Sequence, residues 1–373
     1  MPPRPDHPDS ALHTYISRAI TQAGGWIGFD RFMEMALYTP GLGYYARESV
    51  KFGALPGPGP GGSDFVTAPE ISPLFGYALA QQVAQALADS GCDEVWEFGA
   101  GSGALAAQIL QALDEMGVAL RRYTIVELSA TLQQRQQTRL APWAGRVHWA
   151  HAWPQQIEGV VLGNEVLDAM PVQLLVRQAG QWHERGVVLD GGAPGGFAWQ
   201  DRPSALRPPI EPEGAHDYLT EIHPQAHAFI RSLAEHLVRG SAFLIDYGFG
   251  EDEYYHPQRA MGTLMCHFAH QSDTDPLQRV GEKDITAHVN FTGIALAAQE
   301  AGLQVLGYTS QAHFLMNCGI VDWMQAAALP VRVAAQTLIL EHEMGELFKV
   351  IALGTDPDAA PLGFTRGDRS HRL

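Results

Sequence analysis

Cysteine is scarce in this chain, with three residues in 373. Cys92, Cys266 and Cys318 lie far apart, so they show no metal-ligand spacing, and their odd number argues against a disulfide framework. A reducing cytoplasm is therefore the expected location. No stretch of about eighteen uncharged apolar residues occurs, so no membrane span is predicted. The first residues also lack the apolar core of a signal peptide, and export is not expected.

Basic residues are also few. The chain has 24 Lys and Arg against 41 Asp and Glu, which gives a net charge of −17, and the basic residues form no cluster in the sequence. A surface that follows the phosphates of DNA or RNA needs such a cluster, so nucleic acid is not an expected partner. The acidic balance suits a basic or arginine-bearing partner, and it suits simple solubility equally well.

What the sequence does contain is a globular composition, with 46% hydrophobic residues, and a regular alternation of elements after residue 93. Strands are predicted over 94–98, 122–127 and 159–164, and helices over 103–116 and 129–140. Strands that alternate with helices predict a mostly parallel sheet with helices on both faces, a Rossmann-like α/β fold.

The segments on either side of this alternation are more varied. Helices are predicted before it over 10–25, 29–38 and 73–91. An antiparallel excursion is expected within 172–200, and a long helix over 217–240. The polar stretch 248–290 is predicted to be a long connection, of the kind that is often functional or a lid. The last part is expected to contain a helix over 291–302, a strand over 303–310, further helices over 310–345 and a last strand over 348–354. A loosely ordered tail is expected to follow.

These patterns predict a division of the chain into four regions. They are an N-terminal helical cap with a substrate-covering loop (1–90), a Rossmann-like core that includes the antiparallel excursion (91–250), an inserted α/β lobe together with the C-terminal strands of the core (251–355), and the tail (356–373). The sequence sets no expectation for the oligomeric state.

The stretch EFGAGSGA at 97–104 joins a predicted strand to a predicted helix. Its glycines satisfy the dinucleotide pattern G-x-G-x-x-G/A, which is a weak indication by itself. Glu97 at the strand end suits the cationic amino end of S-adenosylmethionine (SAM) and would be poorly placed beside a pyrophosphate. Glu127 ends the next strand, where a carboxylate accepts ribose hydroxyls in SAM and NAD sites alike.

The prediction is therefore SAM, with NAD or FAD as an alternative. A second alternative is that Glu97 and Glu127 only cap helices while the glycines allow close packing. Asn164 and Glu165 lie at the end of the strand over 159–164, at the edge where open α/β sheets bind ligands. The expected cofactor contacts are Glu97, Gly99, Ala100, Gly101, Ser102, Gly103, Glu127, Leu128, Asn164, Thr67 and Pro69. His267 and His270 have no further ligand at metal spacing, so no metal site is expected.

Several motifs together resemble the MidA-type family of SAM-dependent methyltransferases, over roughly residues 10–355. They are MALYTPGLGYYA (35–46), DFVTAPEISPLFG (64–76), EFGAGSG (97–103), GNEVLDAMPV (163–172), FLIDYGF (243–249), GTLMCHFAH (262–270) and GEKDITAHVNF (281–291). The mitochondrial members of that family are described as assembly factors for respiratory complex I that methylate arginine in one of its subunits. The resemblance therefore implies a class I methyltransferase fold and a protein substrate.

The sequence departs from that family at three places. The loop over 54–62 is enlarged, Asn290 stands where an Asp is usual, and Met265 stands where an Arg is frequent. The last two departures, Asn290 and Met265, concern the substrate pocket and not the cofactor site.

Candidate catalytic residues follow from the chemistry of an arginine acceptor. A guanidinium is protonated, and carboxylates can grip it in a fork geometry. Glu165 and Asp168 follow the strand predicted over 159–164, and a helical turn would place them on one face. His288 is a candidate proton acceptor beside Asp284, and Tyr247 is a candidate pocket wall. Helix capping, cofactor contact and core packing remain alternatives for these residues.

Two aromatic residues and one turn complete the predicted site. Tyr44 and Tyr45 are expected to line an acceptor channel or to pack in the core. The TAPEIS turn at 67–72 is predicted to cover the substrate or the cofactor. The predicted function is methylation of a protein arginine. The alternatives are a small-molecule methyltransferase, a SAM-binding assembly factor or chaperone with little catalysis, and an NAD-dependent enzyme.

Overall fold

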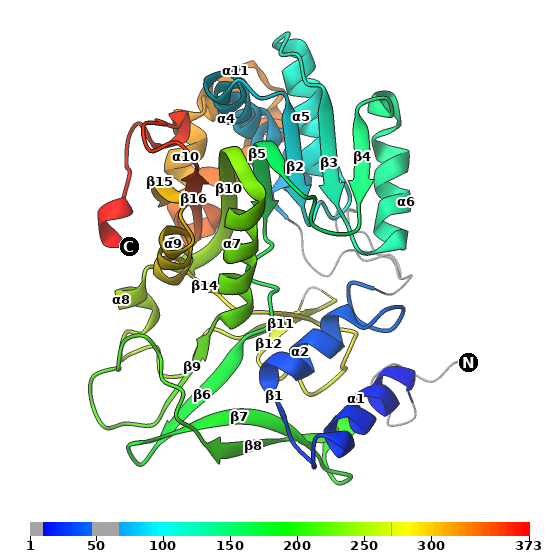
Figure 1. The fold of residues 1–373 in the computed structure, drawn as a ribbon, viewed down its shortest axis with the longest axis vertical. Coiled ribbons are helices and arrows are strands. Elements are labelled where there is room, and N and C mark those ends of the chain that lie inside the picture. Colours follow the sequence, from blue (N-terminus) through cyan, green and yellow to red (C-terminus); the bar gives the residue numbers. More distant parts are fainter. Residues whose placement is uncertain (1–9, 47–66, 270) are drawn as a thin grey trace. The chain divides into compact units, whose positions relative to one another are not determined.

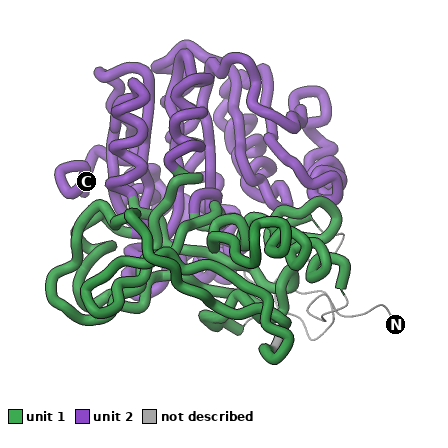
Figure 2. The backbone as a smooth tube through the Cα atoms, turned by 60° about the horizontal axis from the view of Figure 1, so that its bottom comes forward, with its two compact units in different colours: residues 1–50, 168–226, 249–290 green, residues 51–167, 227–248, 291–373 purple. Residues whose placement is uncertain are grey.

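The computed structural model describes residues 10–46, 67–269 and 271–373 (Figure 1). The enlarged loop expected over 54–62 lies outside these residues. Contacts group the chain into two compact units, and each unit is assembled from three segments (Figure 2). Unit 1 consists of residues 1–50, 168–226 and 249–290, and unit 2 of residues 51–167, 227–248 and 291–373. The four-region division remains a prediction.

Unit 2 is built on a mostly parallel sheet. Its strands lie in the order β15-β16-β10-β5-β2-β3-β4, and only β16 runs against its neighbours. The predicted alternating strands 94–98, 122–127 and 159–164 are present as β2, β3 and β5. The strand bounds are β2 Glu94–Phe98, β3 Arg122–Val126, β4 Val147–Ala150, β5 Ile157–Asn164, β10 Leu237–Phe249, β15 Gln304–Ser310 and β16 Phe348–Gly354.

Helices pack on this sheet through one large apolar core. The core joins α4 and α5 to α10 and α12 and to the strands between them. α4 ends at Gly91, which has the left-handed backbone (φ +61°) that a helix C-terminus favours. The helix bounds are α3 Ala68–Ile71, α4 Leu74–Ser90, α5 Ala104–Glu115, α6 Ala130–Arg139, α7 Pro224–His236, α9 Phe291–Glu300, α10 Gln311–Asn317, α11 Ile320–Ala326 and α12 Leu329–Ile339.

The strand order reverses between β2 and β5. The chain proceeds from β2 outward to β3 and β4, then returns to β5 on the other side of β2 and continues to β10. In open α/β sheets, ligands bind at the carboxyl ends of the strands on either side of such a reversal. The residues at the carboxyl ends of β2, β3 and β5 are therefore the candidates for ligand binding.

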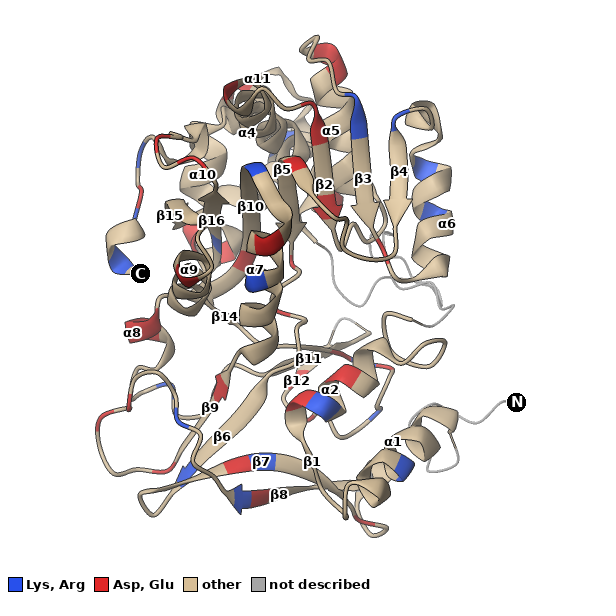
Figure 3. Ribbon diagram, in the orientation of Figure 1, with Lys and Arg blue, Asp and Glu red and all other residues tan. Residues whose placement is uncertain are grey.

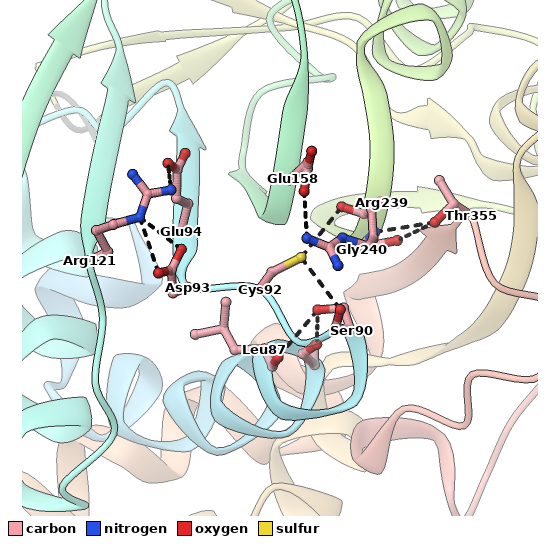
Figure 4. Close-up of polar contacts among 11 residues, drawn as sticks. Leu87, Ser90, Cys92, Asp93, Glu94, Arg121, Glu158, Arg239, Gly240 and Thr355 are labelled. Carbon is pink, nitrogen blue, oxygen red and sulfur yellow. Dashed lines mark hydrogen bonds and ion pairs between the residues drawn. The ribbon is translucent and has the colours of Figure 1, made fainter.

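The opposite, amino-terminal edge of the sheet is occupied by ion pairs (Figure 4). Arg121 donates to both carboxylate oxygens of Asp93, at 3.1 Å each, and also contacts Glu94. Arg239 pairs with Glu158 at the start of β5. Arg121, Asp93, Arg239 and Glu158 are each about half exposed, so the Arg121–Asp93 and Arg239–Glu158 pairs contribute little to stability.

Unit 1 contains a five-stranded antiparallel sheet and a three-stranded one. In the larger sheet the order is β1-β7-β6-β9, with β8 paired to β7, and in the smaller one it is β12-β11-β13. The strand bounds are β1 Ile27–Gly28, β6 Gln173–Gln178, β7 Gln181–Leu189, β8 Phe197–Pro203, β9 Tyr218–Ile222, β11 Met265–Phe268, β12 Gln271–Asp273 and β13 Asp284–Thr286. The two-residue strand β14 (Val289–Asn290) belongs to neither of these sheets.

Two N-terminal helices, α1 (Ala11–Gln22) and α2 (Phe29–Tyr38), pack in the core of unit 1. α1 begins where it was predicted to begin, because the hydroxyl of Ser10 accepts a hydrogen bond from the His13 amide at 3.0 Å. Its buried residues are spaced as a helix requires. The short helix α8 (Glu251–Tyr254) belongs to the third segment of this unit.

Three sequence predictions about individual elements were wrong. The predicted helix 217–240 is strand β9, helix α7 and the first residues of β10, because Pro224 cannot occupy a helix interior and instead begins α7. The predicted connection 248–290 contains α8 and the short strands β11 to β14. The tail is ordered: the amide of Gly363 donates to Gln82 at 2.8 Å, and Asn317 donates to the Gly363 carbonyl at 2.8 Å.

Charged residues are dispersed over both units (Figure 3), and Lys and Arg are spread over several helices and strands rather than gathered in one band. Within the described residues, no helix is both long enough and apolar enough to cross a membrane. Within the same residues, no three His, Cys, Asp or Glu side chains are grouped so as to hold a metal ion.

Candidate functional site

The glycine-rich segment forms a tight loop between β2 and α5. Gly99, Gly101 and Gly103 have φ angles of +65°, +53° and +79°, in the left-handed region that favours glycine. A β-carbon on Gly99 would lie 2.9 Å from a γ-carbon of Val166, so the loop packs directly against the turn that follows β5. A β-carbon on Gly101 would meet no atom within 4 Å. The loop is thus closed on one side and open at Gly101.

Glu127 follows β3 and is 7% exposed. One of its carboxylate oxygens accepts from the Ser129 amide at 2.8 Å, and the other accepts from the Gln136 side chain at 2.9 Å. Burial raises the pKa of Glu127, and these donors counteract part of that rise. The Ser129, Leu128 and Gln136 donors do not use every acceptor site of this carboxylate, and the remainder can accept from a ribose hydroxyl. The neighbouring Leu128 is 78% exposed.

Glu97 lies in β2 and is 2% exposed. Its carboxylate accepts a hydrogen bond from the hydroxyl of Tyr123 at 2.7 Å. Burial raises the pKa of Glu97 to about 7, the Tyr123 hydrogen bond acts in the opposite direction, and the charge of Glu127 adds to the rise. The side chain is enclosed by protein, so its predicted contact with the cofactor amino group remains a prediction.

Glu97→Gln is expected to stabilise the cofactor-free protein at pH 8 and to have little effect near pH 4.5. The pKa of Glu97 is about 7 in the folded protein and 4.5 in the unfolded chain, because burial favours the protonated carboxyl. The stability that the protonated carboxyl contributes is fully present below pH 4.5 and is lost as the pH rises through about 7. Glutamine keeps an acceptor for Tyr123 and carries no charge. The gain at pH 8 is at most about 3 kcal/mol by urea unfolding. An equal difference between the two proteins at both pH values would contradict this.

The TAPEIS turn is fixed to the glycine loop inside unit 2. Glu70 of α3 accepts from the Ser102 hydroxyl, and Arg139 of α6 donates to Glu70 at 2.8 Å and to the Ser102 oxygen at 2.6 Å. The carbonyl of Pro69 accepts from Gln108 of α5 at 2.6 Å. Thr67 occupies the N-cap position of α3. The structure therefore brings these predicted residues next to the glycine loop.

Glu165, directly after β5, has an unusual backbone. Its φ angle is +54°, in the left-handed region that residues other than glycine rarely adopt. Its amide donates to the Ile245 carbonyl at 2.8 Å, and its partly exposed side chain accepts from the Asn164 amide group at 3.0 Å. Non-glycine residues in this region tend to occur at functional sites. The predicted helical turn from Glu165 to Asp168 is absent, because this φ angle is incompatible with a right-handed helix.

β10 supports the same edge from the other side of β5. A carboxylate oxygen of Asp246 accepts from the Leu167 amide at 2.9 Å, so the turn after β5 is held at both ends. Tyr247, a candidate pocket wall, packs its ring against Phe348 at 5.3 Å between ring centres. The structure thus places Tyr247 on a strand of unit 2, beside an aromatic residue of β16.

The remaining catalytic candidates lie in unit 1. Asp284 is 1% exposed and accepts from the Tyr45 hydroxyl at 2.7 Å, and the Asp168 carbonyl accepts from the Ala287 amide at 2.9 Å. Burial and the negative charge of Asp284 raise the pKa of Tyr45 well above its usual value. Tyr44 is buried in the core of this unit.

His288 is held mainly through its backbone. Its amide donates to the Thr263 hydroxyl at 3.0 Å, its carbonyl contacts a ring nitrogen of His223 at 3.0 Å, and its ring packs on Phe249. A role for His288, Asp284 and Asp168 in catalysis remains a prediction.

We call the residues at and beside the carboxyl ends of β2, β3 and β5 the cofactor edge. Three residues at this edge were not expected from the sequence, namely Gln108, Gln136 and Arg139. Each lies on a helix and hydrogen-bonds to the glycine loop, to Glu127 or to α3. Helix α6, which carries Gln136 and Arg139, is polar along its length, and such a helix usually indicates a solvated face. No pattern in the sequence distinguishes its one buried glutamine from its exposed ones.

The residues at this edge fit SAM. Gly101 leaves open space beside the loop, and the Glu127 carboxylate can accept a further hydrogen bond beyond those from Ser129, Leu128 and Gln136. The buried side-chain oxygen of Asn164 accepts no hydrogen bond from any described residue, and it can therefore accept one from a ligand ammonium or hydroxyl group. The fold and this edge together define a class I SAM-dependent methyltransferase.

Comparison with known proteins agrees with this class. Residues 78–309 match the family model "Putative S-adenosyl-L-methionine-dependent methyltransferase". The chain belongs to this family, and the resemblance to MidA-type methyltransferases, the Rossmann-like fold and SAM as the cofactor are confirmed. A crystal structure of a superfamily member from Burkholderia thailandensis with bound S-adenosyl-homocysteine is 50% identical, with a TM-score of 0.91 over 97% of this chain and 96% of that chain.

Curated relatives carry more specific names. The chain is 28% identical over 376 residues to "Protein arginine methyltransferase NDUFAF7, mitochondrial" of Danio rerio, covering 89% of this chain and 84% of that protein. It is 27% identical over 330 residues to the protein of the same name in Homo sapiens, covering 79% and 70%. The predicted cytoplasmic location is contradicted by these relatives, which are named as mitochondrial proteins.

Proposed function

We propose that this protein transfers the methyl group of SAM to a guanidinium nitrogen of arginine in a protein substrate. The observation that carries the proposal is Glu165, a partly exposed carboxylate held in a rare backbone conformation at the end of β5. The turn that contains it packs against the glycine loop through Val166. The names of the curated relatives support an arginine acceptor.

The chemistry requires positioning more than activation. When bound, SAM supplies a methyl group that is already activated by its sulfonium. Glu127, the loop at Gly101 and Asn164 are the residues that would hold the cofactor. Glu165 would grip the guanidinium through two hydrogen bonds, orient one nitrogen and keep the positive charge on the others. The reacting nitrogen forms a bond to the methyl carbon, the carbon–sulfur bond breaks, and the nitrogen loses one proton.

The other candidates have narrower proposed roles. Asp168 would add a second carboxylate for the guanidinium, and Asp284 with His288 would accept the released proton. Tyr247 would form part of the pocket wall. A subunit of respiratory complex I as the acceptor is a further hypothesis, and it rests on the family resemblance alone.

The test is to incubate the purified protein with SAM labelled in its methyl group and a cell lysate that lacks this protein. The lysate is then separated into protein and small-molecule fractions, and the proteins are hydrolysed to amino acids. We expect label in methylarginine, and none when heat-denatured protein is used. Label that appears only in the small-molecule fraction, or in another amino acid, would overturn the arginine proposal and leave the methyltransferase class intact.

A further inference from the structure

Gln136 is the one fully buried polar side chain on α6, a helix with few buried residues. Of the residues in α6, only Leu132 and Gln136 are buried, and Gln136 has no exposed surface. A primary amide without access to water costs free energy unless its oxygen and both of its N–H groups find partners. The partners that Gln136 finds all lie at the cofactor edge or beside it.

The amide nitrogen of Gln136 connects two separate parts of that edge. It donates one hydrogen bond to the carbonyl of Gly101, at 2.9 Å, and one to a carboxylate oxygen of Glu127, also at 2.9 Å. The first partner is the open glycine of the loop after β2, and the second is the carboxylate after β3. A single side chain therefore bridges the loop and that carboxylate.

The orientation of this amide is fixed by Trp149 in β4. The indole N–H of Trp149 donates to the Gln136 oxygen at 2.9 Å. An indole nitrogen can only donate, so a flipped amide would place two N–H donors opposite each other and would turn its oxygen toward the Glu127 carboxylate.

We propose that Gln136 is a positioning residue for the cofactor, which orients Glu127 and ties the glycine loop to it, with its own orientation locked by Trp149. It acts through Glu127 and Gly101 and touches neither the acceptor nor the reacting atoms. The inference concerns cofactor binding and is independent of the identity of the methyl acceptor.

The test measures the Kd for SAM in four proteins by calorimetry: wild type, Gln136→Met, Trp149→Phe and the double variant. Methionine has a length similar to that of glutamine and lacks both donors, so Kd is expected to rise about 10- to 100-fold. Phenylalanine at position 149 removes only the indole hydrogen bond that fixes the orientation of the Gln136 amide, so Kd is expected to rise about 2- to 10-fold. The double variant is expected to bind SAM no more weakly than Gln136→Met, because Trp149 acts through the amide that is already lost.

Gln137→Met is the matched control, since Gln137 is an exposed residue of the same helix. Its Kd is expected to stay within about 2-fold of wild type. A folded Gln136→Met protein that binds SAM as tightly as this control would overturn the proposal. Losses that multiply in the double variant would also overturn it, because they would show that Trp149 acts independently. If Gln136→Met does not fold, the Kd of Trp149→Phe decides. An unchanged Kd would refute the proposal that Trp149 orients the Gln136 amide for cofactor binding, and a raised Kd would support it.

Discussion

Gly101→Val is expected to lower the affinity for SAM more than about 100-fold while leaving the protein folded. The φ angle of Gly101 is +53°, where a β-branched residue is strained by about 1–2 kcal/mol. Its β-carbon would enter the open space beside the loop, which is the space that the cofactor needs. Calorimetric titration with SAM measures the affinity, and urea unfolding measures the stability.

Gly117→Val separates backbone strain from loss of the cofactor space. Gly117 follows the other end of α5, has a φ angle of +69°, is exposed, and has no atom within 4 Å of the position that a β-carbon would occupy. Both variants are expected to lose similar stability, and only Gly101→Val is expected to lose SAM binding. Equal SAM affinities in the two variants would show that the loop does not hold the cofactor.

Glu165→Gln is expected to lower kcat for arginine methylation about 100- to 1,000-fold, because the amide cannot stabilise the guanidinium charge as the nitrogen reacts. The Kd for SAM is expected to remain within about 3-fold, since Glu127 and the glycine loop are unchanged. The rate is measured as label transferred to lysate proteins at saturating SAM.

Glu158→Gln is the matched control for this variant. Glu158 lies at the opposite end of the same strand, where it is 51% exposed and pairs with Arg239. Its removal is expected to leave both kcat and the SAM affinity close to wild type. Equal rates for Glu165→Gln and Glu158→Gln would remove Glu165 from the reaction and would require another carboxylate to grip the acceptor.

The cofactor half of the fold could be predicted because its determinants are local. The strands β2, β3 and β5 are short apolar runs, and the glycines at every second position have φ angles that the spacing already indicates. Glu127 directly follows β3 and Asn164 ends β5, so the strand boundaries alone place them at one edge. The helix predicted over 217–240 failed because the periodicity continued through Pro224, which is itself the signal for a helix start.

What could not be predicted depends on contacts between distant parts of the chain. Unit 1 joins three separate segments, and the short strands β11 to β14 form within a stretch whose polar composition resembles a loop. The left-handed backbone of Glu165 is imposed by its neighbours, including the carbonyl of Ile245 on β10. Gln136 is distinguished from Gln137 only by what β4 and the glycine loop place opposite it.

Every step proposed for the reaction depends on SAM being held by the glycine loop and Glu127. The most direct test is to titrate the purified wild-type protein with SAM and, separately, with NADH. We predict saturable binding of SAM in the micromolar range and no heat of binding with NADH. Binding of NADH, or the absence of SAM binding in a folded protein, would contradict this assignment. This chain would then share the fold of the family without its cofactor chemistry.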